Sequence, residues 1–243
     1  MSKPTSKHTP QPVSSKTTYA LGAVAVAVLL LIVFAVYQWN RGGSDEVRND
    51  GYGSSHDPAV SVALDSDGAI VIGKPNVAKT IDVYEDPLCP ACGLMEKTYG
   101  QEIAQQVDQG KLTVRYRMVN FLDRSSGSKD YSTRAIAANE CVAQAGDGPA
   151  YSKFHALLFT TKQPSEGGSD HDNKELAAIA KESGASDDAV TCITKADRLD
   201  PARNHAEAAL KSLGDRAATP TVLIDGKKVD VFKDTDWVLN ASK

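Results

Sequence analysis

The chain has 243 residues, of which 41% are hydrophobic and 24% are charged, a composition typical of a globular protein that can form a core. Its formal net charge of -4 becomes -7 when the three lysines of the first 18 residues are set aside. Because the remainder has no excess of basic residues, we expect no nucleic-acid partner.

The first feature along the chain is an apolar run without charge from Tyr19 to Trp39. A helix needs about 20 such residues to cross a bilayer, so we predict a single-pass membrane anchor at residues 19–39. A cleavable signal peptide is the alternative, but its apolar part usually has only about 7–15 residues, and no small-residue cleavage site follows before Arg41. The lysines before the run predict a cytoplasmic tail at residues 1–18 and an extracytoplasmic location for the rest.

Residues 40–58 are rich in Gly, Ser, Asp and Asn, which predicts a flexible linker. A single domain is expected at residues 59–243, a length that is ample for one core. It begins with two short apolar segments, Val60–Leu64 and Ala69–Ile72, on either side of Asp65-Ser-Asp-Gly68. This pattern predicts a β-hairpin.

A CxxC motif, Cys89-Pro90-Ala91-Cys92, follows the next predicted strand. Lys79–Glu85 has the pattern of a strand and Gly93–Gln109 that of a helix, so the motif lies at a strand-to-helix junction. Two thiols at this spacing can close a small reversible disulfide ring, which is the reactive part of a thiol-disulfide oxidoreductase. Half of a zinc site is the alternative, but zinc needs four ligands, and the other two cysteines are far apart in the sequence. We predict a redox-active pair, without a metal or a cofactor.

The two thiols of the motif should differ in reactivity. Cys89 lies at the helix start, where free amides and the helix dipole stabilise a thiolate. Cys92 lies about one turn further along and should be more buried. Pro90 suits the first helical turn, where its missing N–H group is tolerated. We therefore predict that Cys89 is the nucleophile and leaving group, and that Cys92 is its resolving partner.

The rest of the chain reads as a strand, a helical block and a final strand pair. The strand is expected at Leu112–Val119, and the pattern is helical from Lys129 to Leu213. Thr221–Ile224 and Lys227–Val231 predict a strand pair around Asp-Gly, and residues 234–240 a short closing helix.

Cys141 and Cys192 fall in two amphipathic helical segments of this block, each flanked by apolar residues. Disulfides persist outside the cytoplasm, and four cysteines allow three pairings. Only a bond between Cys141 and Cys192 leaves the CxxC pair free to cycle. We predict this structural disulfide, with two buried free thiols as the alternative.

Glu85 and Asp86 are the carboxylates nearest to the motif in the sequence. Either could relay a proton to or from Cys92, and a solvated acidic turn is the alternative. The histidines are weaker candidates. His155 lies among apolar residues and is expected to pack at the edge of the core, and Asp170-His171-Asp172 is expected to be a solvated loop.

Three features together resemble the DsbA-like branch of the thioredoxin superfamily, in particular its membrane-anchored members of the bacterial cell envelope. These are Asp86-Pro-Leu-Cys-Pro-Ala-Cys92 after a strand, the helical block, and Thr219-Pro220-Thr-Val-Leu-Ile-Asp-Gly226. The resemblance extends from about Ala59 to the C-terminus. It implies an α/β thioredoxin fold with a helical insertion at about residues 129–213. It also implies a cis-proline loop at Thr219 and Pro220 that packs against the active-site disulfide and pairs with the client backbone.

The chain departs from the pattern of this family at two positions. Many relatives carry histidine where this chain has Ala91, which offers no hydrogen bond to the Cys89 sulfur, so a weaker oxidant is expected. Family members commonly place a buried acid six residues before the first cysteine, where this chain has Val83.

The resemblance implies a protein that introduces disulfides into exported, cysteine-containing clients and is reoxidised by a quinone-linked membrane partner. A reductase or isomerase on the same scaffold is one alternative, because Thr219 before the proline is compatible with either direction. A non-catalytic client-binding module, in which the CxxC pair is a fixed staple, is the other.

Overall fold

The computed structural model describes residues 46–214 and 217–243, and residues 47–243 form one compact unit. No helix of the described residues is both long and apolar enough to cross a membrane. The predicted tail at residues 1–18, the predicted anchor at residues 19–39 and the first part of the predicted linker lie outside the described residues.

Six strands form one mixed sheet in the order β1-β2-β4-β3-β5-β6. They are β1 (Ser61–Leu64), β2 (Ile70–Gly73), β3 (Thr80–Glu85), β4 (Thr113–Met118), β5 (Thr221–Ile224) and β6 (Lys227–Val229). The pair β3 and β4 is parallel, and the other neighbours are antiparallel. Parallel neighbours need a crossover connection, which the helix after β3 provides. The central strand β3 therefore ends where that helix begins.

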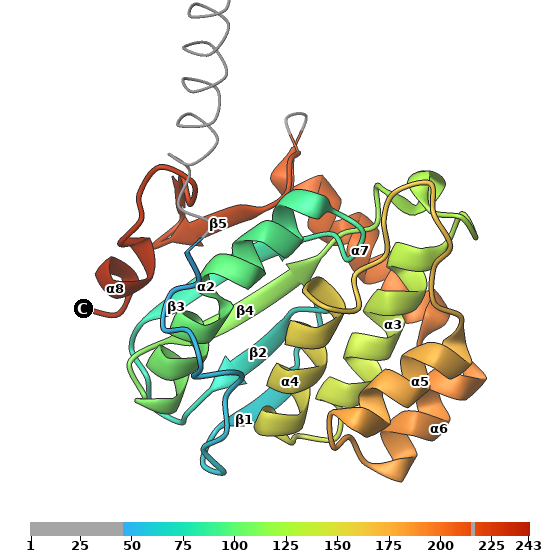
Figure 1. Cartoon of the computed structure of the whole chain (residues 1–243), viewed down its shortest axis with the longest axis horizontal. Helices are drawn as coiled ribbons and strands as arrows, with labels where there is room; N and C mark the ends of the chain where they lie inside the picture. The colour runs from blue at the N-terminus through green and yellow to red at the C-terminus, as the bar shows by residue number, and fades with distance from the viewer. Residues whose placement is uncertain (1–45, 215–216) are drawn as a thin grey trace, which may run out of the picture. The chain divides into compact units, whose positions relative to one another are not determined.

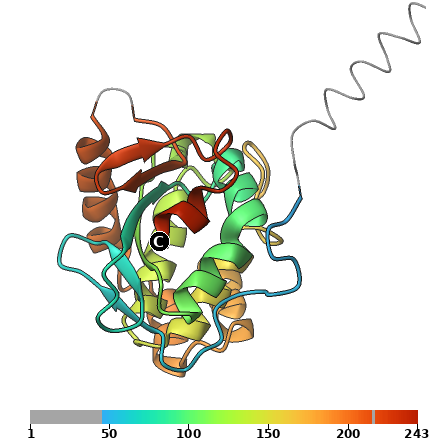
Figure 2. The ribbon, with the colours of Figure 1, turned by 90° about the vertical axis from the view of Figure 1, so that its left-hand side faces the viewer.

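The helices of the described residues cover both faces of this sheet. They are α2 (Pro90–Asp108), α3 (Tyr131–Ala143), α4 (Gly148–Phe159), α5 (Asn173–Glu182), α6 (Asp187–Lys195), α7 (Leu199–Leu213) and α8 (Trp237–Ala241) (Figure 1). Figure 2 shows α7 on one face of the sheet and α2 and α8 on the other. Side chains of β3 alternate between two apolar clusters, because Ile81 and Val83 lie in the main core while Tyr84 packs with Ala209 of α7.

The predicted element order is confirmed from the hairpin to the closing helix. Leu64 pairs with Ile70 across the β1–β2 turn, as the Asp-Gly pattern requires. The helix after the CxxC motif begins at Pro90 instead of Gly93, because proline is well suited to the first helical position. The last helix begins at Trp237 instead of residue 234, because the Asp234 carboxylate accepts a hydrogen bond from the Asp236 amide in the preceding turn.

Residues 47–58, which composition places in a linker, lie against α2. The Arg48 guanidinium is 3.3 Å from the Glu102 carboxylate, and the Tyr52 hydroxyl donates to Asp108 at 2.8 Å. The Ser55 hydroxyl donates to the same Asp108. The compact unit therefore begins at Val47 instead of residue 59. Composition does not show this, because the partners that hold the segment are about fifty residues away.

The helical insert is tied together by a disulfide and by a buried carboxylate. Cys141 of α3 and Cys192 of α6 are bonded, with an S–S distance of 1.96 Å. Glu140 of α3 is fully buried and accepts hydrogen bonds from Arg198 at 2.7 Å and from His205 of α7 at 2.8 Å. These contacts join three helices that are separate in the sequence.

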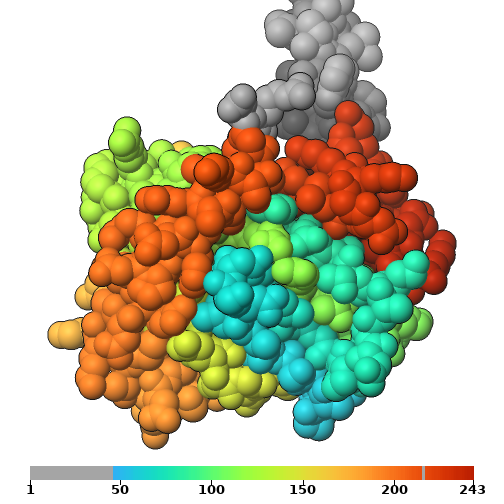
Figure 3. Space-filling view, turned by 180° about the vertical axis from the view of Figure 1, so that it is seen from behind, coloured from blue at the N-terminus to red at the C-terminus, as the bar shows by residue number. Residues whose placement is uncertain are grey.

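The insert also contacts the first hairpin. The view from behind shows the orange segment of α7 beside the cyan β1–β2 hairpin (Figure 3). At Gly68 in the hairpin turn, an added Cβ would lie 2.3 Å from the His205 side chain, and the backbone φ of +81° favours glycine. The close approach of hairpin and α7 therefore requires glycine at this position.

Removal of the Cys141–Cys192 disulfide should destabilise the insert. The bond closes a separation of 51 residues, for which chain entropy gives a stabilisation of about 4 kcal/mol. We expect Cys141→Ala with Cys192→Ala to lower the free energy of unfolding in urea by up to that amount. Both proteins should also carry Cys89→Ser and Cys92→Ser, so that only one disulfide differs between them. An unchanged unfolding midpoint would contradict a stabilising role.

Candidate active site

Cys89 is the residue immediately before α2, and Pro90 is the first residue of the helix. The Cys89 carbonyl accepts a hydrogen bond from the Gly93 amide at 3.1 Å, which closes the first turn. Cys89 is 7% exposed and Cys92 is fully buried, while Pro90 is exposed. Both thiols are free in the structure. The turn thus leaves Cys89 slightly exposed and buries Cys92 completely.

The two thiols have opposite pKa shifts. A hydrogen bond from the Cys92 thiol lowers the pKa of Cys89 to about 6, although burial opposes this change. The Thr219 hydroxyl and the amides of Cys92 and Ala91 lower this pKa further. For Cys92, burial raises the pKa well above that of an ordinary cysteine, and the bond to Cys89 and the nearby Glu85 carboxylate add to the rise. Near neutral pH, Cys89 is therefore the thiolate and Cys92 holds its proton.

The loop before β5 lies against Cys89. The Thr219–Pro220 peptide bond is cis, and the Thr219 carbonyl oxygen is 3.5 Å from the Cys89 sulfur. The Thr219 hydroxyl oxygen is buried as well. The pairing of Thr221 with Tyr84 explains this position, because the start of β5 adjoins the end of β3. The sheet therefore brings together the two segments that the sequence separates by 130 residues.

Asp86 is fully buried beside the motif, and its carboxylate connects the turn before Cys89, the segment after β4 and the first turn of α3. It accepts hydrogen bonds from the amides of Leu88 at 2.9 Å and Leu122 at 3.0 Å, and from the Ser132 hydroxyl at 2.6 Å. Burial raises the pKa of Asp86 to about 7, and these hydrogen bonds limit the rise. Because both oxygens already have donors, Asp86 is arranged to hold the turn before Cys89.

Gln163, which follows α4, also holds the motif, and the sequence does not reveal it. Its side-chain amide donates to the carbonyls of Pro87 at 3.2 Å and Cys89 at 3.0 Å. Gly93 makes this contact possible, since an added Cβ would lie 2.1 Å from the Gln163 oxygen and 2.8 Å from the Phe159 carbonyl. No local pattern could have identified Gln163, because the contact depends on how the insert packs.

Glu85 is fully buried, and neither of its carboxylate oxygens has a hydrogen-bond partner. It lies on the same face of β3 as Val83, because side chains alternate along a strand. Burial raises the pKa of Glu85 to about 8, and the Glu96 carboxylate contributes to the rise. The interpretation of Glu85 and Asp86 as a solvated acidic turn is therefore wrong. Relatives carry their buried acid at the position of Val83, and this chain carries one two residues later, at Glu85.

Glu96 and His155 lie beside Glu85, and sequence reasoning gave neither of them a role in the site. The Nε2 atom of His155 is 3.4 Å from Glu85 and 3.6 Å from Glu96, and both of these partners are buried. Burial disfavours the imidazolium, but the two carboxylates outweigh it and raise the pKa of His155 to about 9. The ligand atoms of these three side chains lie within 4.8 Å of one another, close enough to share a cation. Among the described residues, no other group of His, Cys, Asp and Glu side chains meets this condition. The sequence could have indicated only that Glu96 lies on the same helix face as Cys92, because it follows Cys92 by one helical turn.

The remaining polar candidates have structural partners. The Asp170 side chain is only 5% exposed and accepts from the Ser128 amide and from Arg134, each at 2.8 Å. Asp172 caps α5 through the Glu175 amide at 2.9 Å. The expectation of a solvated loop at these residues is wrong for Asp170, because Arg134 and Ser128 approach it from the start of the insert.

Residues 65–239 match the sequence model of a protein family described as Thioredoxin. The chain belongs to the thioredoxin family. The solved structure of MdbA, a thiol-disulfide oxidoreductase from Corynebacterium diphtheriae, is 34% identical with a TM-score of 0.66, and the match covers 77% of this chain and 95% of MdbA. An oxidised DsbA from Mycobacterium tuberculosis is 30% identical with a TM-score of 0.57, over 75% of this chain and 97% of DsbA. The α/β thioredoxin-like fold with a helical insertion is thus shared with thiol-disulfide oxidoreductases.

A curated relative is a larger protein. The serine/threonine-protein kinase PknE of Mycobacterium tuberculosis is 37% identical over 183 residues, which cover 74% of this chain and 32% of PknE. The chain therefore spans about a third of the length of the curated relatives that it matches.

The thiolate of Cys89 should be detectable by its reactivity. We expect the rate of alkylation of the reduced protein by iodoacetamide to rise with pH around a midpoint near 6. Cys92→Ala should move this midpoint toward the ordinary cysteine pKa of about 8.5, because the main donor is lost. Thr219→Val should move it less, because Thr219 contributes less than Cys92. A midpoint of 8 or above in the unchanged protein would contradict the assignment.

The same lowered pKa makes the stability of the reduced fold depend on pH. A thiol whose pKa is lower in the folded state contributes stability above its unfolded pKa of about 8.5. That contribution is lost as the pH falls through about 6.

Proposed function

We propose that this protein is an extracytoplasmic thiol-disulfide oxidoreductase that introduces disulfide bonds into exported proteins through Cys89 and Cys92. The observation that carries the proposal is the asymmetry of the pair, with a Cys89 pKa lowered to about 6 and a buried Cys92 whose pKa is raised. The similarity to MdbA and DsbA supports the same chemistry. In this proposal Pro90 and Ala91 form the active-site turn.

The reaction would be a two-step exchange in which the enzyme begins with a Cys89–Cys92 disulfide. A client thiolate attacks the Cys89 sulfur, and Cys92 leaves and takes up a proton. The second client thiolate then attacks the client sulfur of the mixed disulfide, and Cys89 leaves as a thiolate. The client loses two electrons and gains a disulfide, and the enzyme is left with a Cys89 thiolate and a Cys92 thiol. Thr219 and Pro220, beside Cys89, would pair with the client backbone during these steps.

The direction of electron flow follows from the stability of the leaving group. A stabilised Cys89 thiolate favours the reduced enzyme and therefore makes the disulfide form an oxidant. Ala91 has no side-chain donor for the sulfur, so this stabilisation comes from Cys92, Thr219 and the helix amides. We therefore expect an oxidant that is weaker than DsbA.

Glu85 and Asp86 would have separate tasks in this reaction. Glu85 is the proton partner of Cys92, since its carboxylate has no hydrogen-bond donor and acts electrostatically on the buried thiol. Asp86 keeps the turn before Cys89 in place through its three donors. Replacement of Asp86 would then disturb both steps, whereas replacement of Glu85 would act on the proton of Cys92.

The proposed cellular setting depends on the first residues of the chain. The uncharged run at residues 19–39 supports a membrane anchor, and the basic residues before it support a cytoplasmic tail at residues 1–18. The oxidoreductase domain would then meet cysteine-containing clients as they are exported. Return of Cys89 and Cys92 to the disulfide form requires an electron acceptor, and we propose a quinone-linked membrane protein for this role.

Substitution of each cysteine separately tests the assigned roles. Cys89→Ser should abolish the oxidation of a reduced dithiol peptide, because the attacked sulfur is lost. Cys92→Ser, mixed with the disulfide form of the same peptide, should instead accumulate a covalent adduct between Cys89 and the peptide, because the Cys89 thiolate opens the peptide disulfide and the resolving thiol is lost. Mass spectrometry without reductant measures both outcomes. If the Cys92→Ser protein forms no adduct while the unchanged protein turns over, the roles are assigned wrongly.

A further inference from the structure

Glu85, Glu96 and His155 come from three different elements and meet beneath the active-site turn. Glu85 ends β3, Glu96 lies on α2 one turn after Cys92, and His155 lies on α4. One imidazole nitrogen, Nε2, faces both carboxylates at 3.4 and 3.6 Å. Each of the three residues is 5% exposed or less. Buried charges require partners, and here one imidazolium serves two carboxylates.

The protonation of this cluster is coupled to that of the two thiols. A thiolate at Cys89 favours the protonated form of Glu85, and an ionised Glu85 favours the protonated form of Cys92. The other titratable groups facing His155 are Tyr116 of β4 and Tyr151 of α4, whose rings lie 4.1 and 5.9 Å from the imidazole. Burial raises the pKa of both tyrosines well above 10, so they stay neutral and do not balance the charge.

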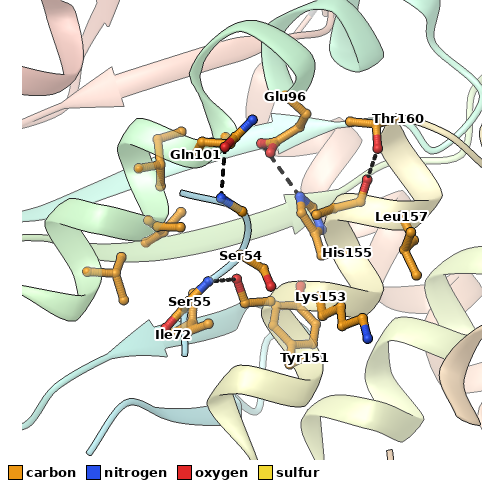
Figure 4. Close-up of a pocket in the computed structure, with 18 of the residues that line it drawn as sticks. Ser54, Ser55, Ile72, Glu96, Gln101, Tyr151, Lys153, His155, Leu157 and Thr160 are labelled. Atoms are coloured by element: carbon orange, nitrogen blue, oxygen red, sulfur yellow. Dashed lines mark hydrogen bonds and ion pairs between the residues drawn. The ribbon is translucent and has the colours of Figure 1, made fainter. Parts of the chain in front are cut away.

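The cluster also adjoins a cavity of about 320 Å³. Figure 4 shows Glu96 and His155 pointing toward each other in its lining, with Ser54 and Gln101 nearby. Glu85 and Cys92 are not part of the lining, and neither are Cys89, Thr219 and Pro220. Glu96 and His155 therefore lie between the buried Glu85 and a space that is separate from the proposed client-binding loop.

We propose that Glu96 and His155 are positioning residues that complete a proton path from Cys92 through Glu85 to this cavity. The inference rests on the proposed function of the Cys89–Cys92 pair and assigns two further residues to it. When a client attacks Cys89, the S–S bond breaks and the Cys92 sulfur takes the electron pair and the proton of Glu85. Glu85 then regains a proton from the His155 imidazolium, which is reprotonated from the cavity side next to Glu96. In the reverse step the proton leaves Cys92 by the same groups.

The test isolates the step that needs the Cys92 proton. The reduced full-length chain is mixed with oxidised glutathione, and acid-quenched samples give the rate at which Cys92 releases glutathione from Cys89. Iodoacetamide alkylation of Cys89, which does not involve this proton, is measured in parallel. The variants are Glu96→Gln and His155→Gln. Tyr151→Phe, in the same cavity lining but outside the path, is the matched control.

We expect His155→Gln to slow glutathione release about a hundredfold at pH 7, the lower end of what a proton-transfer group contributes, with alkylation changed less than about twofold in both variants. The pH profile of glutathione release should move in opposite directions in the two variants. His155→Gln removes a cation that favours ionised Glu85, so the profile moves to higher pH. Glu96→Gln removes an anion that favours protonated Glu85, so the profile moves to lower pH. Tyr151→Phe should leave the release rate and its pH profile unchanged.

The proposal would be overturned if both variants released glutathione at the rate and with the pH profile of the unchanged protein. It would also be overturned if Tyr151→Phe changed them as much as the two variants do. If His155→Gln fails to fold, Glu96→Gln, which keeps the side-chain shape, decides alone. Stoichiometric zinc in the purified protein that is lost in Glu96→Gln would also overturn it, in favour of a metal site. If the unchanged protein never releases glutathione, the proposed function of the pair fails instead.

Discussion

The effect of the Cys92 thiol on the pKa of Cys89 is the interaction on which the proposed chemistry depends. It follows from the start of α2 at Pro90, which places Cys89 at the helix N-terminus and Cys92 one turn inside. Burial alone would raise the pKa of both thiols. The interaction between the two thiols, helped at Cys89 by the amides of the first turn, reverses this effect on the pKa of Cys89 and reinforces it for Cys92. One sulfur is thereby ready to leave as a thiolate, and the other is ready to hold a proton.

The helical insert has a direct part in maintaining this arrangement. Ser132 of α3 donates to Asp86, Gln163 after α4 donates to the Cys89 carbonyl, and His155 of α4 faces Glu85. Without the insert, Asp86 and the Cys89 carbonyl would each lose one donor and Glu85 would lose its imidazole partner, and such losses are costly for buried polar groups. The Cys141–Cys192 disulfide, which joins α3 to α6, therefore stabilises the elements that hold the active-site turn as well as the insert itself.

The sequence predicts those features of the molecule that depend on neighbours along the chain. The hairpin, the strand-to-helix junction and the order of the elements follow from apolar periodicity and from Gly and Pro positions, which act locally. The alternation of side chains along β3 places Glu85 on the same buried face as Ile81 and Val83, whereas the family pattern has its acid at the position of Val83. The contacts of His155 and Gln163 could not be predicted, because they depend on how α4 packs against α2. The docking of residues 47–58 on α2 escaped prediction for the same reason.

The reduction potential of the Cys89–Cys92 pair tests the central claim most directly, because it measures how strongly the fold favours the thiolate form over the disulfide. Equilibration of the full-length chain with glutathione buffers at pH 7, followed by quantification of the free thiols, gives this value. We predict a potential between that of thioredoxin, at about -270 mV, and that of DsbA, at about -120 mV. A value at or below that of thioredoxin would contradict the account and identify the protein as a reductase.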